Sequence, residues 1–132
     1  MAKPKPKRFE YGVSLDPEGR LGTDGASLEI PETWKPEHLV LAGLARCSLT
    51  SLRYHARRAG ISVEAEATTH GVVTPREEDG RYAFVRIEFA SAVTFDPKPA
   101  QPQIAELLAK AERDCFVGAS LSPAPTYVWT VT

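Results

Sequence analysis

The stretch "KPEHLVLAGLARCSLTSLRYHARRAG", Lys35–Gly60, decides the fold, because it predicts one long helix. Pro36 suits the first helical turn, Glu37 complements the positive end of the helix, and no strong breaker follows before Gly60. We therefore expect a helix over residues 36–59, about 36 Å long at roughly 1.5 Å per residue.

The predicted helix has no wide polar stripe in its first two thirds, whereas its end is basic. The apolar side chains are those of Leu39, Val40, Leu41, Leu44, Leu49 and Leu52. A helix that is apolar on most sides is buried on several of them. A chain of 132 residues can bury such a helix only if a sheet wraps around it and a second subunit helps to cover it. We therefore expect an obligate homodimer with a largely hydrophobic interface.

The sequence on either side of the helix predicts strands. Residues 9–30 alternate short strand-like pieces with turn signals, which indicates a small meander. Residues 61–73 and 82–95 alternate apolar and polar side chains, as two half-buried antiparallel strands do, and Arg76–Arg81 is the polar hairpin tip between them. The second strand is expected to place on one face Val85, Ile87, Phe89, Val93 and Phe95.

The last third of the chain predicts a second helix and a closing strand. Apolar residues recur at helical spacing at Ile104, Leu107, Leu108 and Ala111, and residues 124–132 are rich in β-branched and aromatic side chains. The fold class is therefore α+β, with helices packed on a curved antiparallel sheet.

Composition bounds the class of protein. The chain has 132 residues, of which 42% are hydrophobic and 25% charged, and a net charge of -1, which fits a single domain over residues 1–132 with a flexible basic tail at 1–8. No apolar secretory segment and no uncharged run near the ~20 residues of a membrane span is present, so we expect a cytoplasmic protein without a membrane partner. The tail "KPKPKR" lacks interleaved aromatic residues, so no nucleic acid partner is expected.

One of the two cysteines, Cys47, lies in the middle of the predicted helix. Its helical neighbours at three and four residues are Gly43, Leu44, Thr50 and Ser51, none of which is a base or a cation. Arg46 is adjacent in sequence but points about 100° away around the helix. The residues alone leave Cys47 as either a packed thiol or a reactive one, and these neighbours favour the packed thiol.

The second cysteine, Cys115, ends the amphipathic helix. Charged residues, a glycine and two prolines replace the regular periodicity there, so we expect an exposed, flexible thiol that can approach and leave another sulfur. Asp114 beside it is expected to be a surface carboxylate.

Other cysteine chemistry is not supported by the spacing. His38, His55 and His70 with two cysteines contain no zinc-binding repeat, and nothing places a histidine at Cys47 for a Cys-His hydrolase. We expect neither a metal nor another cofactor.

Two segments, "KPEHLVLAGLARCSLTSLRYHARRAGI" and "AERDCFVGASLSPAPTYVWTV", resemble the OsmC/Ohr family of osmotically inducible and organic hydroperoxide resistance proteins. The specific motifs are the PE-x-L…C helix and the C-x-V-x-x-[SN]-L loop with its terminal aromatic strand, and the element order is similar over essentially the whole chain. The resemblance implies a fold in which curved sheets wrap a long helix in an intertwined homodimer with two interface sites.

The resemblance also implies a thiol-dependent peroxidase that reduces organic hydroperoxides without a metal or organic cofactor. Cys47 matches the peroxidatic thiol, which becomes a sulfenic acid, and Cys115 matches the resolving thiol, which condenses with it to a disulfide. An external dithiol then resets the enzyme, and lipoylated proteins do so in similar proteins. Leu39, Leu44 and Phe116 are either pocket residues that favour alkyl hydroperoxides or plain core.

The family also uses an arginine and a glutamate at the reactive sulfur. The glutamate matches Glu37, which is ten helical residues from Cys47, about 15 Å along the axis, and so must come from the other subunit. Arg20 is the first choice for the arginine and Arg46 the reserve. The register around Arg20 differs from the family's, which keeps open a second class of function, a dimeric binding or stress module with little turnover.

Overall fold

The computed structural model describes residues 5–132, which form two compact units that divide between Lys35 and Pro36. The predicted tail at residues 1–8 lies partly outside the described residues, and residues 5–8 are exposed without helix or strand.

The second unit begins with the predicted long helix, α1 (Pro36–Arg58). Its end is a Schellman motif, in which the Gly60 N–H donates to the Arg57 carbonyl and the Ile61 N–H to the Ala56 carbonyl. Gly60 has φ +74°, a conformation that costs glycine little. The helix therefore stops where the sequence predicts, and the chain turns directly into the sheet.

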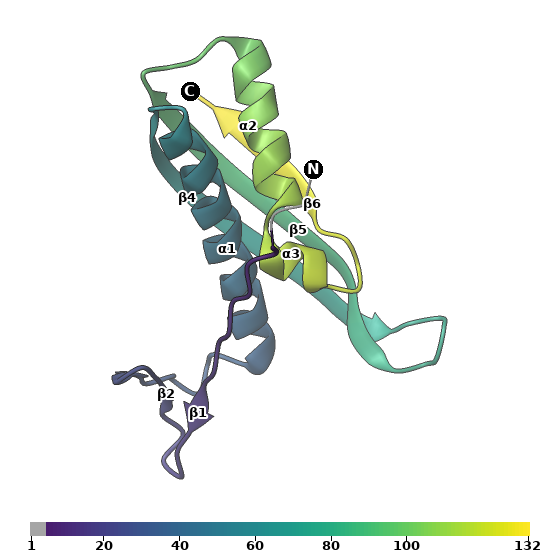
Figure 1. Cartoon of the computed structure of the whole chain (residues 1–132). Coiled ribbons are helices and arrows are strands. Elements are labelled where there is room, and N and C mark those ends of the chain that lie inside the picture. The colour runs from purple at the N-terminus through teal and green to yellow at the C-terminus, as the bar shows by residue number, and fades with distance from the viewer. Residues whose placement is uncertain (1–4) are drawn as a thin grey trace. The chain divides into compact units, whose positions relative to one another are not determined.

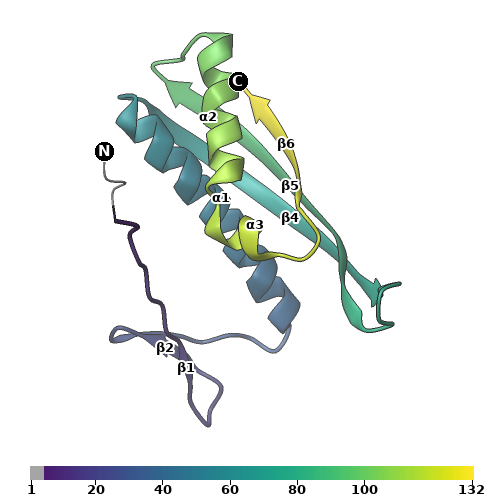
Figure 2. The ribbon, with the colours of Figure 1, turned by 45° about the vertical axis from the view of Figure 1, so that its right-hand side comes forward.

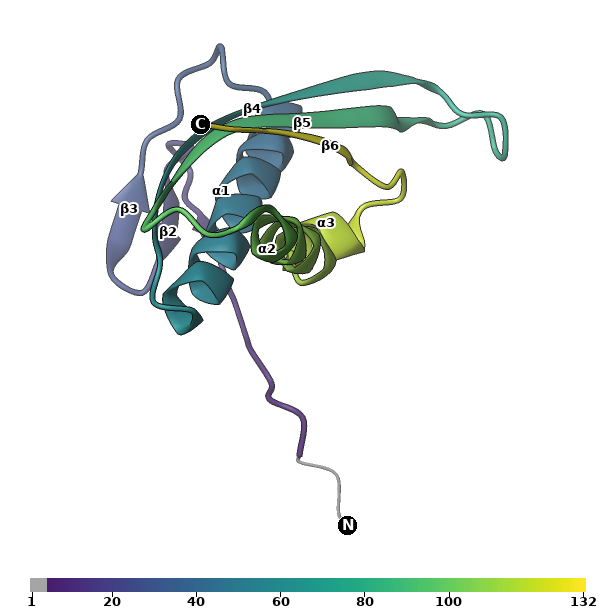
Figure 3. The ribbon, with the colours of Figure 1, turned by 90° about the horizontal axis from the view of Figure 1, so that it is seen from above.

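The sheet of this unit has the order β4-β5-β6, with strands β4 (Ser62–Pro75), β5 (Tyr82–Asp96) and β6 (Thr126–Val131). β4 and β5 form the predicted antiparallel hairpin, closed by the Arg76–Arg81 turn. Figure 3 shows the three strands as one curved layer with all three helices on one of its faces.

The expected position of Val85 on the buried face is wrong, because the β5 strand has a bulge there. Val72 pairs with Arg86 and Val73 with Phe84, so Val85 is the extra residue. The bulge reverses the alternation, which leaves Val85 39% exposed and turns Phe84 toward the core. Beyond the bulge the inner face follows the prediction, with Ile87, Phe89, Val93 and Phe95 buried.

The expected antiparallel pairing holds for β4 and β5, but β6 pairs in parallel with β5, so the sheet is mixed. Parallel neighbours need a crossover connection. Here it consists of α2 (Gln101–Arg113) and α3 (Phe116–Ser120), and it carries Cys115 between the two helices. The class remains α+β, with a mixed sheet.

The core of the second unit lies between the helices and the sheet. α1 and α2 run side by side over the sheet (Figure 1, Figure 2). One cluster joins α1, α2 and the sheet; its buried residues are Leu52, Ala56, Ile61, Val93, Phe95, Ile104, Leu107 and Ala111. A second cluster, around Leu44, Ile87 and Cys115, brings the two cysteines into the same region.

The first unit is the predicted meander, an antiparallel sheet of β1 (Ser14–Leu15), β2 (Leu21–Thr23) and β3 (Ala26–Leu28). Asp24 and Gly25 both have positive φ, as the two-residue turn of a tight hairpin requires. None of residues 5–35 is buried, and several large apolar side chains are exposed: Tyr11, Val13, Leu15 and Leu28. This small sheet therefore has no core of its own.

Candidate active site

The candidate site is centred on the two cysteine sulfurs, which are both free thiols. Cys47, in the middle of α1, is half-buried and packs at the edge of the cluster that contains Leu44, Ile87 and Cys115. The Cys115 sulfur is close enough to Cys47 to raise the pKa of the Cys47 thiol. The crossover thus brings together the two cysteines to which the resemblance gives redox roles.

Cys115 is fully buried, which corrects the expectation of an exposed, flexible thiol. It caps the N-terminus of α3, where its Sγ accepts from the Gly118 N–H at 3.3 Å. Its Sγ also lies 3.4 Å from the Ser48 Oγ, and either atom can donate. The polar residues before Cys115 stay at least partly exposed, while the capped turn places the Cys115 sulfur in the core.

Burial raises the pKa of the Cys47 thiol. The backbone N–H groups of Val117 and Phe116 lower this pKa, but Cys115 raises it further. Burial is the largest of these effects, so the second unit by itself favours the protonated thiol at neutral pH. A reactive Cys47 therefore needs a cation from elsewhere.

Tyr127, on β6, reaches the same region and was not predicted from the sequence. Its buried hydroxyl has no partner with hydrogen-bond geometry among the described residues, although Ser48 and Cys115 are near enough to influence it. Burial raises the pKa of Tyr127, and the charge of Cys115 adds to this effect. A Cβ placed on Gly118 would lie 2.8 Å from this hydroxyl, so the contact leaves no room for a side chain there.

Glu37 lies in the exposed first turn of α1, ten residues before Cys47. The rise of a helix separates the two by about 15 Å along its axis. The structure therefore does not bring Glu37 and Cys47 together within one chain.

Arg20 lies in the first unit, between β1 and β2. Its Nε donates to the Asp16 Oδ2 at 2.8 Å, and its guanidinium is 3.6 Å from the Glu18 carboxylate. The hydrogen bond to Arg20 lowers the pKa of Asp16. Half of the Arg20 side chain remains exposed at this turn.

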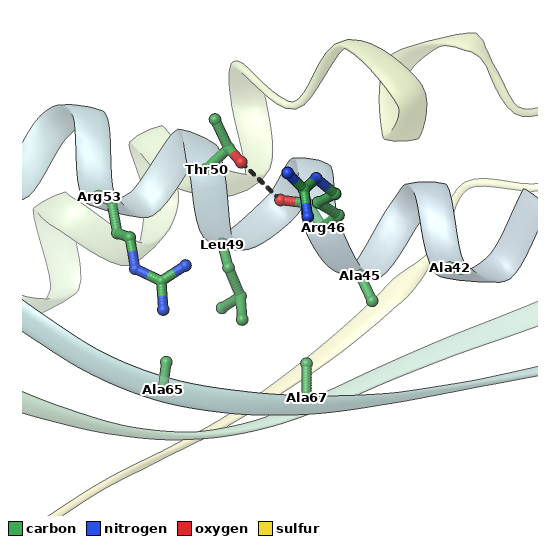
Figure 4. A pocket seen from close by; sticks show the side chains of 8 residues that line it. All are labelled: Ala42, Ala45, Arg46, Leu49, Thr50, Arg53, Ala65 and Ala67. Atoms are coloured by element: carbon green, nitrogen blue, oxygen red, sulfur yellow. Dashed lines mark hydrogen bonds between the residues drawn. The ribbon is translucent and has the colours of Figure 1, made fainter. Parts of the chain in front are cut away.

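Arg46 lines an open hollow between α1 and β4. Figure 4 shows Leu49 and Arg53 pointing across this hollow toward Ala65 and Ala67 of β4. The hollow includes neither cysteine. Arg46 thus lies on the side of α1 that faces β4, while Cys47 packs against the region of Cys115.

The expected pocket residues divide between core and surface. Leu44 is completely buried beside Cys115, Leu39 is half-buried, and Phe116 is 54% exposed. Leu44 is thus a core residue, whereas Phe116 stays accessible next to the cysteines.

Metal-binding and membrane-spanning features are both absent from residues 5–132. This range contains no cluster of three or more His, Cys, Asp or Glu side chains that could hold a metal ion. Nor does any helix within it combine the length and the apolar character needed to cross a membrane.

Comparison with known proteins gives a family and a fold. Residues 30–130 match the family described as OsmC-like protein. No curated protein matches the chain. Among solved structures, an OsmC-like protein of unknown function from Vibrio cholerae has a TM-score of 0.69 and 17% identity, over 86% of this chain and 83% of the other.

Two further solved structures carry a functional name. The organic hydroperoxide resistance protein of Elizabethkingia anophelis has a TM-score of 0.65 and 18% identity, over 97% of this chain and 99% of that one. The organic hydroperoxide resistance protein of Bacillus subtilis has a TM-score of 0.56 and 18% identity, over 93% and 96%. At these identities the likeness shows a shared fold.

Proposed function

The chain belongs to the OsmC-like protein family, and from this premise we propose that it is a thiol peroxidase that reduces organic hydroperoxides to alcohols. The observation that carries the proposal is the packing of two free thiols, Cys47 and Cys115, in one cluster. Support also comes from the names of the organic hydroperoxide resistance proteins that share the fold. The proposed compartment is the cytoplasm, where thiols are kept reduced.

The proposed cycle has three steps. The Cys47 thiolate attacks the terminal peroxide oxygen, an S–O bond forms, the O–O bond breaks, and the alkoxide takes a proton and leaves as the alcohol. The Cys115 sulfur then attacks the Cys47 sulfenic acid, an S–S bond forms, and the hydroxyl leaves with the Cys115 proton as water. An external dithiol, with lipoylated proteins as the first candidates, reduces the disulfide and is itself oxidised.

Two charged residues are proposed to serve Cys47 in a homodimer. Because burial raises the pKa of Cys47, the mechanism needs a nearby positive charge to give thiolate at neutral pH. Arg20 is the proposed source of that charge. Glu37 of the partner subunit is the proposed carboxylate that orients the arginine, since a Glu37 on the same helix is too distant.

Intact mass tests the redox chemistry directly. One equivalent of cumene hydroperoxide, added to the reduced protein without reductant, should remove two hydrogens as one Cys47–Cys115 bond forms. The Cys47→Ser variant should keep its mass and reduce no peroxide. The Cys115→Ser variant should turn over once and then gain oxygen, because a sulfenic acid without a resolving thiol is oxidised further.

The outcomes separate two functions. An unchanged wild-type mass with two titratable thiols would favour a dimeric binding or stress module over a peroxidase. An active Cys47→Ser variant, together with a Cys115→Ser variant that consumes no peroxide, would reverse the two roles.

A further inference from the structure

A half-buried polar contact joins α1 to the residue that precedes Cys115. The His55 Nε2 lies 2.8 Å from the Asp114 Oδ2, and the His55 side chain is only 13% exposed. The hydrogen bonds to Arg113 and His55 hold the pKa of Asp114 at about 2 despite some burial, so its carboxylate is ionised at neutral pH. An ionised carboxylate only accepts, so the Nε2 of His55 carries the proton and donates.

Asp114 occupies the hinge of the crossover. It is the C-cap of α2, where its backbone N–H donates to the Lys110 carbonyl, and the next residue, Cys115, is the N-cap of α3. A contact that fixes Asp114 therefore also restricts the backbone that carries the Cys115 sulfur.

The contact belongs to a polar stripe on an otherwise apolar helix face. Ser48 and His55, seven residues apart on α1, contact the consecutive residues Cys115 and Asp114. Ser51 lies between them, and its hydroxyl is buried without a hydrogen bond among the described residues. The neighbouring interface of α1 with α2 is filled by aliphatic residues such as Leu52, Ala56 and Ala111.

Polar groups in such an interface give less stability than aliphatic ones, but they define one relative position of the two elements. The His55 bond acts at the hinge, where α2 has ended and α3 has not begun. Without this bond, the Cys115 segment would lose a restraint and sample more positions relative to Cys47.

We propose that His55 is a positioning residue for Cys115. Through Asp114, His55 holds the resolving sulfur of Cys115 where it can reach Cys47. The inference rests on the proposed function for its biological role. The step that it assists joins the Cys115 sulfur to the Cys47 sulfenic acid and releases water. It leaves the preceding attack of Cys47 on the peroxide unaffected.

The first test needs no peroxide. Equilibration with reduced and oxidised glutathione measures the effective concentration of one sulfur near the other. His55→Leu should lower this value about tenfold, the scale of a lost hydrogen bond to a charged group. His55→Gln should stay within about threefold of wild type, because the Gln amide carries a donor near the position of the His Nε2.

The matched control is Arg113→Gln, which removes the other partner of Asp114 and keeps the contact to His55. It should leave the glutathione equilibrium unchanged. Urea unfolding of each reduced variant checks that the fold is intact. Equal effective concentrations in wild type and in folded His55→Leu would overturn the inference, as would a His55→Gln variant as impaired as His55→Leu.

A second measurement separates the two steps with peroxide. In single turnover, His55→Leu should form the Cys47 sulfenic acid at the wild-type rate, close the disulfide about tenfold more slowly, and gain more sulfinic acid. If wild type itself forms neither species, the proposed function fails, while the glutathione result still decides the role of His55. Slowing of both steps alike would contradict a positioning role.

Discussion

At the scale of single residues, the environment of Cys47 sets its requirement for a cation. Burial and the neighbouring Cys115 both favour the protonated thiol, and the backbone N–H groups of Val117 and Phe116 only partly offset them. The sequence already favoured a packed thiol, since no helical neighbour of Cys47 is a base or a cation. The N–H groups could not be foreseen, because they come from α3, about 70 residues further along the chain.

The proposed role of Arg20 can be tested by the pH dependence of Cys47 alkylation. Arg20→Ala should raise the Cys47 pKa toward or above ~8.5, because burial then acts unopposed. A raised pKa leaves less thiolate at neutral pH. The alkylation rate at neutral pH should therefore fall about tenfold for each unit by which this pKa rises. Iodoacetamide rates measured from about pH 5 to about pH 10 give the profile, because this range spans the ordinary cysteine pKa.

Arg46→Ala is the matched control, because it removes an arginine adjacent in sequence that lines the hollow next to β4. Its profile should coincide with that of wild type. If the pH profile of alkylation shifts in the Arg46 variant and not in the Arg20 variant, Arg46 is the activating cation.

The burial of Cys115 shows where residue-level prediction reached its limit. Asp114, Gly118 and the prolines at 123 and 125 are typical of an exposed loop. In the structure Asp114 bonds to His55, and the Cys115 sulfur caps α3 by accepting from the Gly118 N–H. These polar groups are thus satisfied by contacts with α1 and α3, which local composition cannot reveal.

At the scale of elements, α3 approaches β6 closely at Gly118, where the Tyr127 hydroxyl is the neighbour. A Cβ at this position would lie 2.8 Å from the Tyr127 hydroxyl and 3.4 Å from the Cys115 sulfur. Both neighbours belong to the candidate site, so the packing of these elements and the position of the Cys115 sulfur are linked.

Gly118→Ala should therefore destabilise the chain by about 1–3 kcal/mol, the usual cost of overpacking. Urea denaturation followed by circular dichroism measures the change. Gly12→Ala is the control, because a Cβ there meets nothing within 4 Å, and it should alter stability by less than about 0.5 kcal/mol. A Gly118→Ala variant as stable as wild type would show that the Tyr127 ring moves aside freely.

The elements themselves were predictable, but their pairing was not. Periodicity defined α2, β4 and β5, because each buries one face and the sequence repeats at the period of that face, whereas start signals and the lack of a breaker before Gly60 defined α1. The parallel pairing of β6 depends on which edge of the sheet the crossover reaches, and the bulge at Val85 depends on the partner strand. Both are long-range properties that no window of local sequence contains.

At the scale of the whole molecule, exposed apolar surface argues for a second subunit. In the first unit Leu15 is 69% exposed and Tyr11 82%, and no residue of 5–35 is buried. On α1, Val40 is 37% exposed. Such surface is typical of a face that another chain covers.

We expect light scattering at micromolar concentration to give a mass close to twice the 14.4 kDa of the chain. Leu15→Glu should shift the protein toward monomer, because the proposed interface would then bury an unpaired charge. Gln101→Glu, at the exposed start of α2, makes the same change of −1 in net charge; it is the matched control and should remain dimeric. A monomeric wild type would contradict the dimer and, with it, the supply of Glu37 by the partner subunit.

The parallel pairing of β6 has a consequence for the order in which the chain folds. A hairpin such as β4–β5 can close by itself as soon as both strands exist, whereas β6 must wait until α2 and α3 have crossed the sheet. The neighbours that enclose Cys115 thus assemble late, while the helix that carries Cys47 can form early. A newly made chain therefore passes through a period in which Cys47 is present without Cys115 packed beside it.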